Sequence, residues 1–256
     1  MTKLYNSIIY GPVKSRRLGI SLGINLLPVI SKACSFNCIY CECGQNEDYA
    51  VKGKFASEED FNLNLSHTLQ EMKRNGQGLD TITFAGNGEP TLHPAFAKII
   101  DTTISLRNQF YPACKISVLS NATTLGRSSV REALGKVDNA ILKIDSAFER
   151  TIRLMDRPQE TYSLDEVVEN MRSLPGRFYI QTMFLRGYCN KEKIDNTTSE
   201  EVKAWQELIL RIRPFGVMVY SIDRDTPCKT LEKISKEEMS TFVDRLLKEG
   251  INCSIA

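Results

Sequence analysis

The chain has 256 residues, of which 42% are hydrophobic and 25% are charged, so it is long enough for one large α/β domain or two small ones. Its formal net charge of +2 neither requires nor excludes a nucleic-acid partner. No apolar run approaches the ~20 residues that a membrane helix needs, which predicts a globular protein that does not span a membrane.

The N-terminus lacks the apolar core and the small-residue cleavage site of a secretory signal, which predicts a cytoplasmic location. In that reducing compartment, the eight cysteines are not expected to form a framework of disulfides.

Hydrophobic periodicity predicts strands and helices that alternate along the chain, with no low-complexity linker or internal repeat. The predicted strands are residues 21–27, 79–85, 115–120, 140–145, 178–185 and 215–222. Helices are predicted at 93–106, 129–134, 148–155 and 164–174, and the caps Ser57, Thr198 and Ser235 open three more. Strands that alternate with helices favour right-handed crossovers, a parallel sheet with helices on its outer face, and a curved, partly open barrel.

The loop after the first strand contains three cysteines, Cys34, Cys38 and Cys41, in C-x3-C-x2-C spacing. Four thiolates would close a four-iron cluster, whereas three leave one iron open to a small molecule. A zinc site is an alternative, but structural zinc takes four ligands, and the chain has two histidines and no second C-x2-C pair. Three incidental core thiols are another alternative, which the polar Ser35 and Asn37 between them disfavour.

With Tyr40 directly before the third cysteine, this motif resembles the signature of the radical S-adenosylmethionine (radical SAM) superfamily. The resemblance implies a single domain over residues 1–256, with a partial (β/α)6 barrel at about 18–248 and a short N-terminal extension at 1–17. It also implies that Cys34, Cys38 and Cys41 bind a [4Fe-4S] cluster whose open iron holds the amino and carboxylate groups of SAM.

The activity that this resemblance implies is that of an oxidoreductase-type radical enzyme. An electron from a flavodoxin- or ferredoxin-type donor cleaves SAM to methionine and a 5′-deoxyadenosyl radical, which abstracts hydrogen from a substrate. The substrate class is open, and small molecules, peptides and RNA are all acted on within the superfamily. Tyr40 is expected beside the cofactor.

In folds of this kind, reactive groups collect where strands end. After the second strand comes Gly86-Asn87-Gly88-Glu89-Pro90. Gly88 and Glu89 match the Gly-Gly-Glu motif with which the family contacts the amino group of SAM, and Asn87 replaces the first glycine. A plain glycine-rich turn is the alternative.

The next strands supply further candidates for cofactor binding. Ser120 and Asn121 suit a ribose diol, although these residue types also make ordinary turns. Lys143 and Asp145 lie two positions apart and share one face, where they either line the cofactor cavity or form a structural ion pair. Gln181, in the middle of the fifth strand, is expected to approach the adenosine.

The sixth strand ends in polar residues that face either the substrate mouth or solvent, namely Tyr220, Asp223 and Arg224. Near the N-terminus, Lys14, Arg16 and Arg17 either bind phosphate or form a basic surface turn. Together with residues 39–44, this N-terminal stretch resembles a branch described as iron–sulfur oxidoreductases related to wybutosine synthesis.

Five cysteines lie outside the motif: Cys43, Cys114, Cys189, Cys228 and Cys253. Their scatter disfavours an auxiliary cluster without excluding one, since residues distant in sequence can converge in space. Two alternatives from other classes stay open. An electron-carrier or zinc-binding module would take Cys43 as the nearest fourth ligand, and an RNA-binding protein would use the three N-terminal cations.

Overall fold

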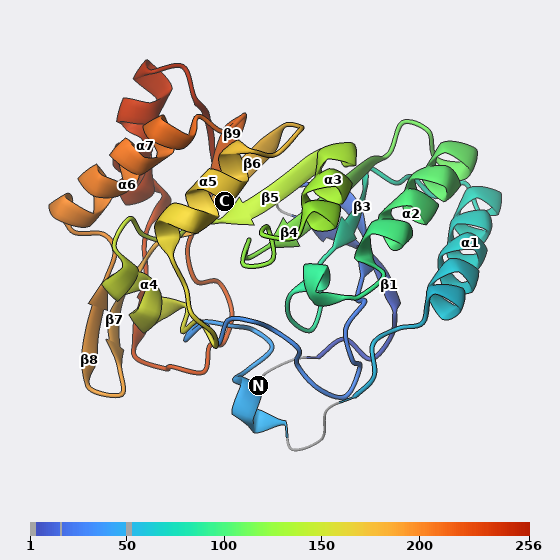
Figure 1. Cartoon of the computed structure of the whole chain (residues 1–256), viewed down its shortest axis with the longest axis horizontal. Helices are drawn as coiled ribbons and strands as arrows, with labels where there is room; N and C mark the ends of the chain where they lie inside the picture. Colours follow the sequence, from blue (N-terminus) through green and yellow to red (C-terminus); the bar gives the residue numbers. More distant parts are fainter. Residues whose placement is uncertain (1–3, 16, 50–52) are drawn as a thin grey trace.

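The structure is a computed structural model that describes residues 4–15, 17–49 and 53–256 (Figure 1). Its described residues build an eight-stranded sheet in the order β1-β2-β3-β4-β5-β6-β9-β11, in which β1 is antiparallel to β2 and the other pairs are parallel. The strands of this sheet are β1 (Ile9–Ser15), β2 (Gly19–Ile24), β3 (Thr81–Phe84), β4 (Lys115–Ser120), β5 (Asn139–Lys143), β6 (Phe178–Met183), β9 (Gly216–Tyr220) and β11 (Asn252–Ile255).

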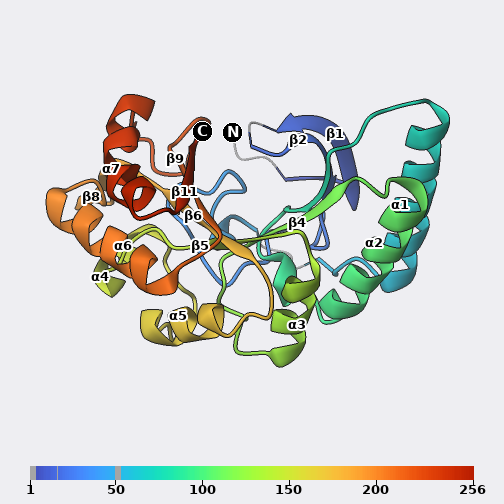
Figure 2. The same cartoon turned by 90° about the horizontal axis from the view of Figure 1, so that it is seen from above.

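The sheet curls, and the helices lie around its outer side (Figure 2). The helices are α1 (Glu58–Arg74), α2 (Phe96–Phe110), α3 (Ser128–Lys136), α4 (Glu149–Met155), α5 (Leu164–Arg172), α6 (Ser199–Ile212) and α7 (Lys236–Lys248), with short 3-10 turns η1 (Asn46–Asp48) and η2 (Pro90–Leu92). The α/β class and the mostly parallel sheet predicted from the sequence are therefore confirmed.

Alternation along the strands gives the sheet two different faces. Apolar residues such as Leu22, Ile82 and Ile180 are fully buried in one core cluster with residues of the covering helices. Polar side chains occupy the alternate positions, where Thr83 accepts a hydrogen bond from Ser21 at 2.8 Å and other hydroxyls and amides pair across neighbouring strands. The concave inner face of the curled sheet is thus polar.

The helix caps expected from the sequence are present. The side chains of Ser57, Thr198 and Ser235 each accept a hydrogen bond from the backbone N–H three residues later, and each helix begins with acidic residues. None of the helices in the described ranges combines the length and the apolar character needed to cross a bilayer.

A second, three-stranded antiparallel sheet was not predicted. It has the order β10-β7-β8, with strands β7 (Leu185–Cys189), β8 (Glu192–Asp195) and β10 (Leu231–Lys233). The predicted strand 178–185 ends earlier, at Met183, and the chain passes into β7 through Phe184. The hairpin between β7 and β8 turns at Asn190 and Lys191, both with positive φ, without the glycine that usually signals such a turn.

The two edge strands of the main sheet were also missed. β1 pairs antiparallel with β2 over residues 9–24, and β11 adds four residues beside β9 after the last helix. Neither shows a clear period of two between apolar and polar residues, and both depend on a neighbouring strand for their hydrogen bonds.

Candidate active site

The cysteine loop follows β2 and is anchored to the loop after β3. Ala33 pairs with Gly88 as an isolated parallel bridge, in which the Ala33 N–H donates to the Asn87 carbonyl at 2.9 Å and the Glu89 N–H donates to the Ala33 carbonyl at 3.0 Å. Gly88 has φ +134°, and a Cβ built on it would lie 1.9 Å from the Ala33 oxygen. Only glycine allows this close approach, which explains the second glycine of the motif.

A second anchor joins the same loop to the end of α4. The backbone N–H of Asn37 donates to the carbonyl of Asp156, and the N–H of Ile39 donates to the carbonyl of Met155, both at 2.9 Å. Because Asn37 and Ile39 flank Cys38, these bonds position the middle cysteine relative to α4.

The three motif thiols share one electrostatic environment. Burial raises the pKa of Cys34 to about 12 and that of Cys38 well above its usual value. A hydrogen bond from the Cys43 thiol and the nearby charge of Lys32 together lower the pKa of Cys41 to about 6, against the opposing effect of burial. Thiols as buried as Cys34 and Cys38 become thiolates when metal ions supply the positive charge.

Lys32 is a buried cation in this loop. Its ammonium donates to the Gly44 carbonyl at 2.9 Å, and although burial opposes its charge, the thiols of Cys41 and Cys34 raise its pKa. A cation placed among three thiols stabilises the negative charge of a thiolate-ligated cluster.

The donor set fits an iron–sulfur cluster better than a single zinc ion. Within the described residues, no group of three or more His, Cys, Asp or Glu side chains is arranged around one ion position. Zinc requires its sulfur ligands at about 2.3 Å from one centre, whereas a four-iron cluster places each thiolate on a different iron and holds the sulfurs further apart. The zinc alternative therefore finds no support in this geometry.

The candidates after β3 and β4 meet beside Cys34. The Glu89 carboxylate is 2% exposed and accepts hydrogen bonds from the Asn121 N–H at 2.6 Å and the Thr91 N–H at 3.1 Å. Burial raises the pKa of Glu89 against the opposing effect of these bonds. The Asn121 amide approaches the Cys34 sulfur at 3.7 Å.

The neighbouring Ser120 hydroxyl accepts from the Ala122 N–H at 3.0 Å and takes part in the turn that follows β4. Glu89, Ser120 and Asn121, predicted separately, are thus brought together on one side of the cysteine loop.

Asn87, which replaces the first glycine of the family motif, has a structural role. It is fully buried, and its amide both accepts from the Tyr5 N–H and donates to the Tyr5 carbonyl, at 2.8 Å each. It also donates to the Pro28 carbonyl at 2.8 Å. The substitution therefore fastens the N-terminal segment to the site.

The candidates Lys143, Asp145 and Tyr40 form a buried polar network on the Cys38 side. The Lys143 ammonium contacts the Asp145 carboxylate and lies 4.5 Å from the centre of the Tyr40 ring. The Tyr40 hydroxyl donates to Asp145, and the Met183 N–H donates to the same carboxylate at 2.9 Å. The structure thus contains the ion pair that the sequence offered as one alternative, inside the curled sheet.

Asp156 completes this network and was not found from the sequence. Its carboxylate is 2.9 Å from the Lys143 ammonium and accepts a hydrogen bond from the Tyr40 hydroxyl at 3.2 Å. Burial raises the pKa of Asp156 to about 7, although Lys143 opposes the shift. Asp156 follows α4 directly, a position where an acidic residue is ordinary, so no local signal distinguishes it.

The remaining candidates lie deeper on the inner face or at the mouth. Gln181 is the register partner of Lys143 in β6, and its side-chain carbonyl accepts from Arg17 at 3.4 Å. Tyr220 is half-buried, and the Arg17 guanidinium lies 4.6 Å from the centre of its ring. Lys14 is exposed on β1, and Arg16 lies outside the described residues.

The charged residues after β9 do not point into the curled sheet. Asp223 pairs with Lys233 at 2.9 Å, and Arg224 pairs with Glu42 of the cysteine loop at 2.5 Å. Both pairs are substantially exposed, so the solvated-loop alternative describes them, with Arg224 also joining this loop to the cysteine loop.

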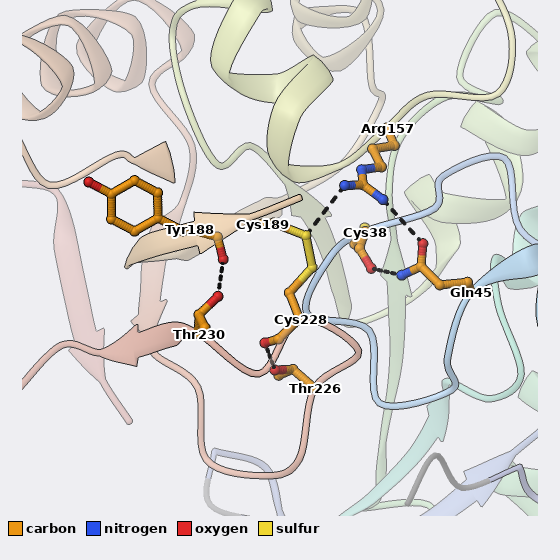
Figure 3. Close-up of a disulfide and its surroundings, with 8 residues drawn as sticks. All are labelled: Cys38, Gln45, Arg157, Tyr188, Cys189, Thr226, Cys228 and Thr230. Carbon is orange, nitrogen blue, oxygen red and sulfur yellow. Dashed lines mark hydrogen bonds between the residues drawn. A yellow bond between two sulfur atoms is a disulfide. The ribbon is translucent and has the colours of Figure 1, made fainter. Parts of the chain in front are cut away.

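Of the five other cysteines, two are brought together. Cys189 at the end of β7 and Cys228 form a disulfide with a Cα–Cα distance of 5.6 Å (Figure 3). The Cys228 N–H donates to the Ile39 carbonyl, and Arg157 contacts both the Cys189 sulfur and Gln45 of the cysteine loop. One disulfide, and not a framework, therefore forms beside the cysteine loop.

The other three cysteines are unpaired. Cys43 is buried next to Cys41 and lies 3.5 Å from the Gly86 carbonyl, while Cys114 and Cys253 pack separately against the main core. Apart from the Cys189–Cys228 pair, the five cysteines thus lie in separate parts of the fold, with Cys43 beside Cys41, Cys114 directly before β4 and Cys253 on β11.

The comparison with known families bears directly on this site. Residues 29–198, which include the cysteine loop and four of the main-sheet strands, match the family model of the Radical SAM superfamily. The chain belongs to the radical SAM superfamily. It is an enzyme of that superfamily, whose members use a [4Fe-4S] cluster and SAM.

Curated relatives of this radical SAM chain include a UPF0026 protein of Methanocaldococcus jannaschii. It is 32% identical over a stretch that covers 77% of this chain and 60% of the relative's length. A UPF0026 protein of a Synechocystis species is 30% identical over 88% of this chain and 78% of its own. A protein of Brachyspira hyodysenteriae named GTPase Obg is 29% identical over 93% of this chain, which spans 33% of that relative's length.

Solved structures share the fold at low sequence identity. A radical SAM methyltransferase from Sphaerobacter thermophilus superposes with a TM-score of 0.68 at 12% identity, over 92% of this chain and 66% of its own. Streptococcus suis SuiB bound to S-adenosylmethionine gives 0.63 at 13% identity, over 90% of this chain and 51% of its own.

Proposed function

We propose that Cys34, Cys38 and Cys41 hold three irons of a [4Fe-4S] cluster and leave the fourth iron for SAM, and that the enzyme abstracts hydrogen from its substrate. The observation that carries this proposal is the set of three half-buried cysteines in one loop, anchored to two other segments beside the polar inner face of the sheet. When bound, the cluster and SAM supply reductive cleavage of a carbon–sulfur bond and a radical that takes hydrogen.

The chain's own residues position SAM and exclude water from it. Glu89 is proposed to receive the amino group of SAM, with Ser120 and Asn121 at the ribose, because these three meet beside Cys34. Tyr40, Lys143, Asp145 and Gln181 are proposed to line the adenosine side, since they lie by Cys38 and on the adjoining strands.

The buried network of Lys143, Asp145 and Asp156 suits radical chemistry for a physical reason. The Lys143 ammonium contacts both carboxylates, so neither carboxylate is buried without a cation beside it. A rigid, dry cavity confines a reactive group to the substrate atom placed beside it.

Two further elements belong to the proposal. The electron donor is of the flavodoxin or ferredoxin type, as the superfamily chemistry requires a one-electron reductant. The chain acts as a single domain over residues 1–256, with the core at 18–248 and an extension at 1–17, of which β1 pairs with β2 of the core.

The test is anaerobic reconstitution with iron and sulfide, followed by metal and sulfide analysis, EPR of the reduced protein and measurement of 5′-deoxyadenosine from SAM. Wild type should bind four irons with sulfide and release 5′-deoxyadenosine, and Cys38→Ala should lose both the intact cluster signal and the product. Cys253→Ala is the matched control, because Cys253 is a half-buried cysteine on β11 outside the motif.

Zinc without sulfide in the wild-type protein, or undiminished 5′-deoxyadenosine release by Cys38→Ala, would contradict the assignment. Loss of the product in both variants would instead indicate general damage by cysteine replacement.

A further inference from the structure

Arg17 connects two distant parts of the curled sheet. It lies in the turn between β1 and β2, near one edge, yet its guanidinium reaches Gln181 of β6 and Tyr220 of β9. In the strand order, β2 and β6 are separated by β3, β4 and β5, so the Arg17 side chain crosses the concave side of the sheet and does not follow its surface. The contact places a cation over the polar inner face.

The charge of Arg17 is not balanced by the protein. Among the described residues, no carboxylate lies within ion-pair distance of its guanidinium, and its side chain makes one hydrogen bond, to Gln181 at a long 3.4 Å. Lys143, the other inner-face cation, contacts two carboxylates. A half-buried guanidinium has five N–H donors, and leaving most of them unpaired costs free energy that a ligand can recover.

The groups around Arg17 are chiefly hydrogen-bond donors. Gln181 is 7% exposed, its carbonyl oxygen accepts from Arg17, and its amide N–H groups have no partner within the described ranges. The Tyr220 hydroxyl likewise has no hydrogen-bond partner there. The nearby carboxylates of Asp145 and Asp156 are paired with Lys143 and accept hydrogen bonds from the Tyr40 hydroxyl, so they do not form ion pairs with Arg17.

We propose that Arg17, Gln181 and Tyr220 form an anion subsite that holds a carboxylate or phosphate group of the substrate on the concave side of the sheet. This inference rests on the proposed function, because it assigns the substrate of that site. A guanidinium fork matches both oxyanions with two parallel hydrogen bonds, and a tyrosine ring under the fork holds its plane in place. The substrate is therefore a molecule with an anionic group.

The chain contains a matched control for Arg17. Arg177 lies over the Phe215 ring at the same distance, 4.6 Å, but both residues are exposed, at the start of β6 and just before β9. Arg177→Gln thus removes a cation and a ring contact of the same kind away from the inner face.

The experiment uses the reconstituted, SAM-bound holoenzyme and two probes, inorganic phosphate and succinate, titrated by calorimetry at fixed ionic strength. Wild type should bind at least one probe, and Arg17→Gln should weaken that binding by about tenfold or more, because a charge-assisted bidentate contact is lost. Arg177→Gln should bind the probes within twofold of wild type. The preferred probe identifies phosphate or carboxylate as the group recognised.

A second variant keeps the proposal testable if Arg17→Gln folds poorly. Gln181→Glu supplies the missing carboxylate from within the protein, so it should pair with Arg17, retain the cluster absorbance and bind the probes about tenfold or more weakly. Far-UV circular dichroism checks that each variant is folded.

Three results would overturn the proposal: no probe binding by wild type, unchanged probe binding by Arg17→Gln or Gln181→Glu, or a tenfold loss of SAM affinity in Arg17→Gln with probe binding intact. The last would place Arg17 at SAM instead of the substrate. Probe binding needs no turnover, so Arg17-dependent binding in an enzyme that fails to release 5′-deoxyadenosine would reject the proposed function and leave the anion subsite standing.

Discussion

Replacing Lys143 with methionine removes the cation from the buried network and leaves two carboxylates without it. Lys143 is 8% exposed, and Asp145 and Asp156 are each 1% exposed. Asp145 keeps hydrogen bonds from the Tyr40 hydroxyl and the Met183 N–H, and Asp156 keeps one from the same hydroxyl, but both lose their cation. Because the pKa of Asp156 is about 7, the buried charge that loses its partner at lower pH is that of Asp145, and Asp156 decides how the cost changes with pH.

The expected loss of stability can be estimated from the buried ion pair and from the titration of Asp156. Removing one partner of a buried ion pair costs about 3–5 kcal/mol. The Asp156 carboxyl already holds a proton below about pH 7 in the wild-type protein, so its protonation adds to the difference between the two proteins only above pH 7, at about 1.4 kcal/mol per pH unit. Lys143→Met should therefore lower the free energy of unfolding by about 3–5 kcal/mol at pH 5.5 and by about 1.4 kcal/mol more at pH 8.

The direction of the pH dependence follows from the linkage between proton binding and folding. Without Lys143, the folded-state pKa of Asp156 rises further above its unfolded-state value, so the folded protein retains a proton that the unfolded chain releases. Stability of the variant relative to wild type should then fall as pH rises above about 7. Asp156→Asn in the same background removes the titrating group and should abolish this extra pH dependence.

The assay is urea unfolding of the chelator-treated apoprotein, followed by circular dichroism at both pH values. Lys136→Met is the control, because Lys136 pairs with Asp101 at 2.7 Å on the surface, where about 0–1 kcal/mol is expected. A cost below 1 kcal/mol for Lys143→Met, or a cost that does not shrink at pH 5.5, would refute the reasoning.

Other changes test the loop anchor, the disulfide and a core thiol. Gly88→Ala places a methyl group 1.9 Å from the Ala33 oxygen. We expect it to lower the free energy of unfolding in urea by about 3 kcal/mol or more and to impair reconstitution of the cluster. An unchanged free energy of unfolding would contradict the close approach of the two segments. Replacing Cys189 and Cys228 with alanine removes a crosslink that spans 39 residues, and we expect it to lower the free energy of unfolding by about 4 kcal/mol without reductant. In excess dithiothreitol, which reduces the disulfide of the wild type, the variant should be almost as stable as the wild type. An equal loss of stability under both conditions would argue against the disulfide. Burial raises the pKa of Cys114 to about 11, so iodoacetamide should alkylate it at pH 8 at least about tenfold more slowly in the folded protein than in urea, and equal rates measured by mass spectrometry would disagree with this environment.

Much of the architecture was accessible from the sequence because it depends on neighbours along the chain. The caps Ser57, Thr198 and Ser235 open their helices as predicted, since a cap satisfies backbone N–H groups only three residues away. The six predicted strands all occur, because alternation is also local, although most of their bounds shift by up to three residues. The edge strands and the second sheet were missed because their formation depends on the strands with which they pair and not on a pattern in their own sequence.

The chemistry of the site divides in the same way. The spacing of Cys34, Cys38 and Cys41 is a property of a short segment, so the family and its cofactors were predicted before any fold was known. The partners of Lys143 and Arg17 were not, because an ion pair with Asp156 or a contact with Tyr220 exists only after the sheet has curled. Sequence alone thus determined the cofactor class, through ligands that one loop supplies. Tertiary structure decided which charges are neutralised and which is left for a ligand, because electrostatic interaction depends on distance in space and not along the chain.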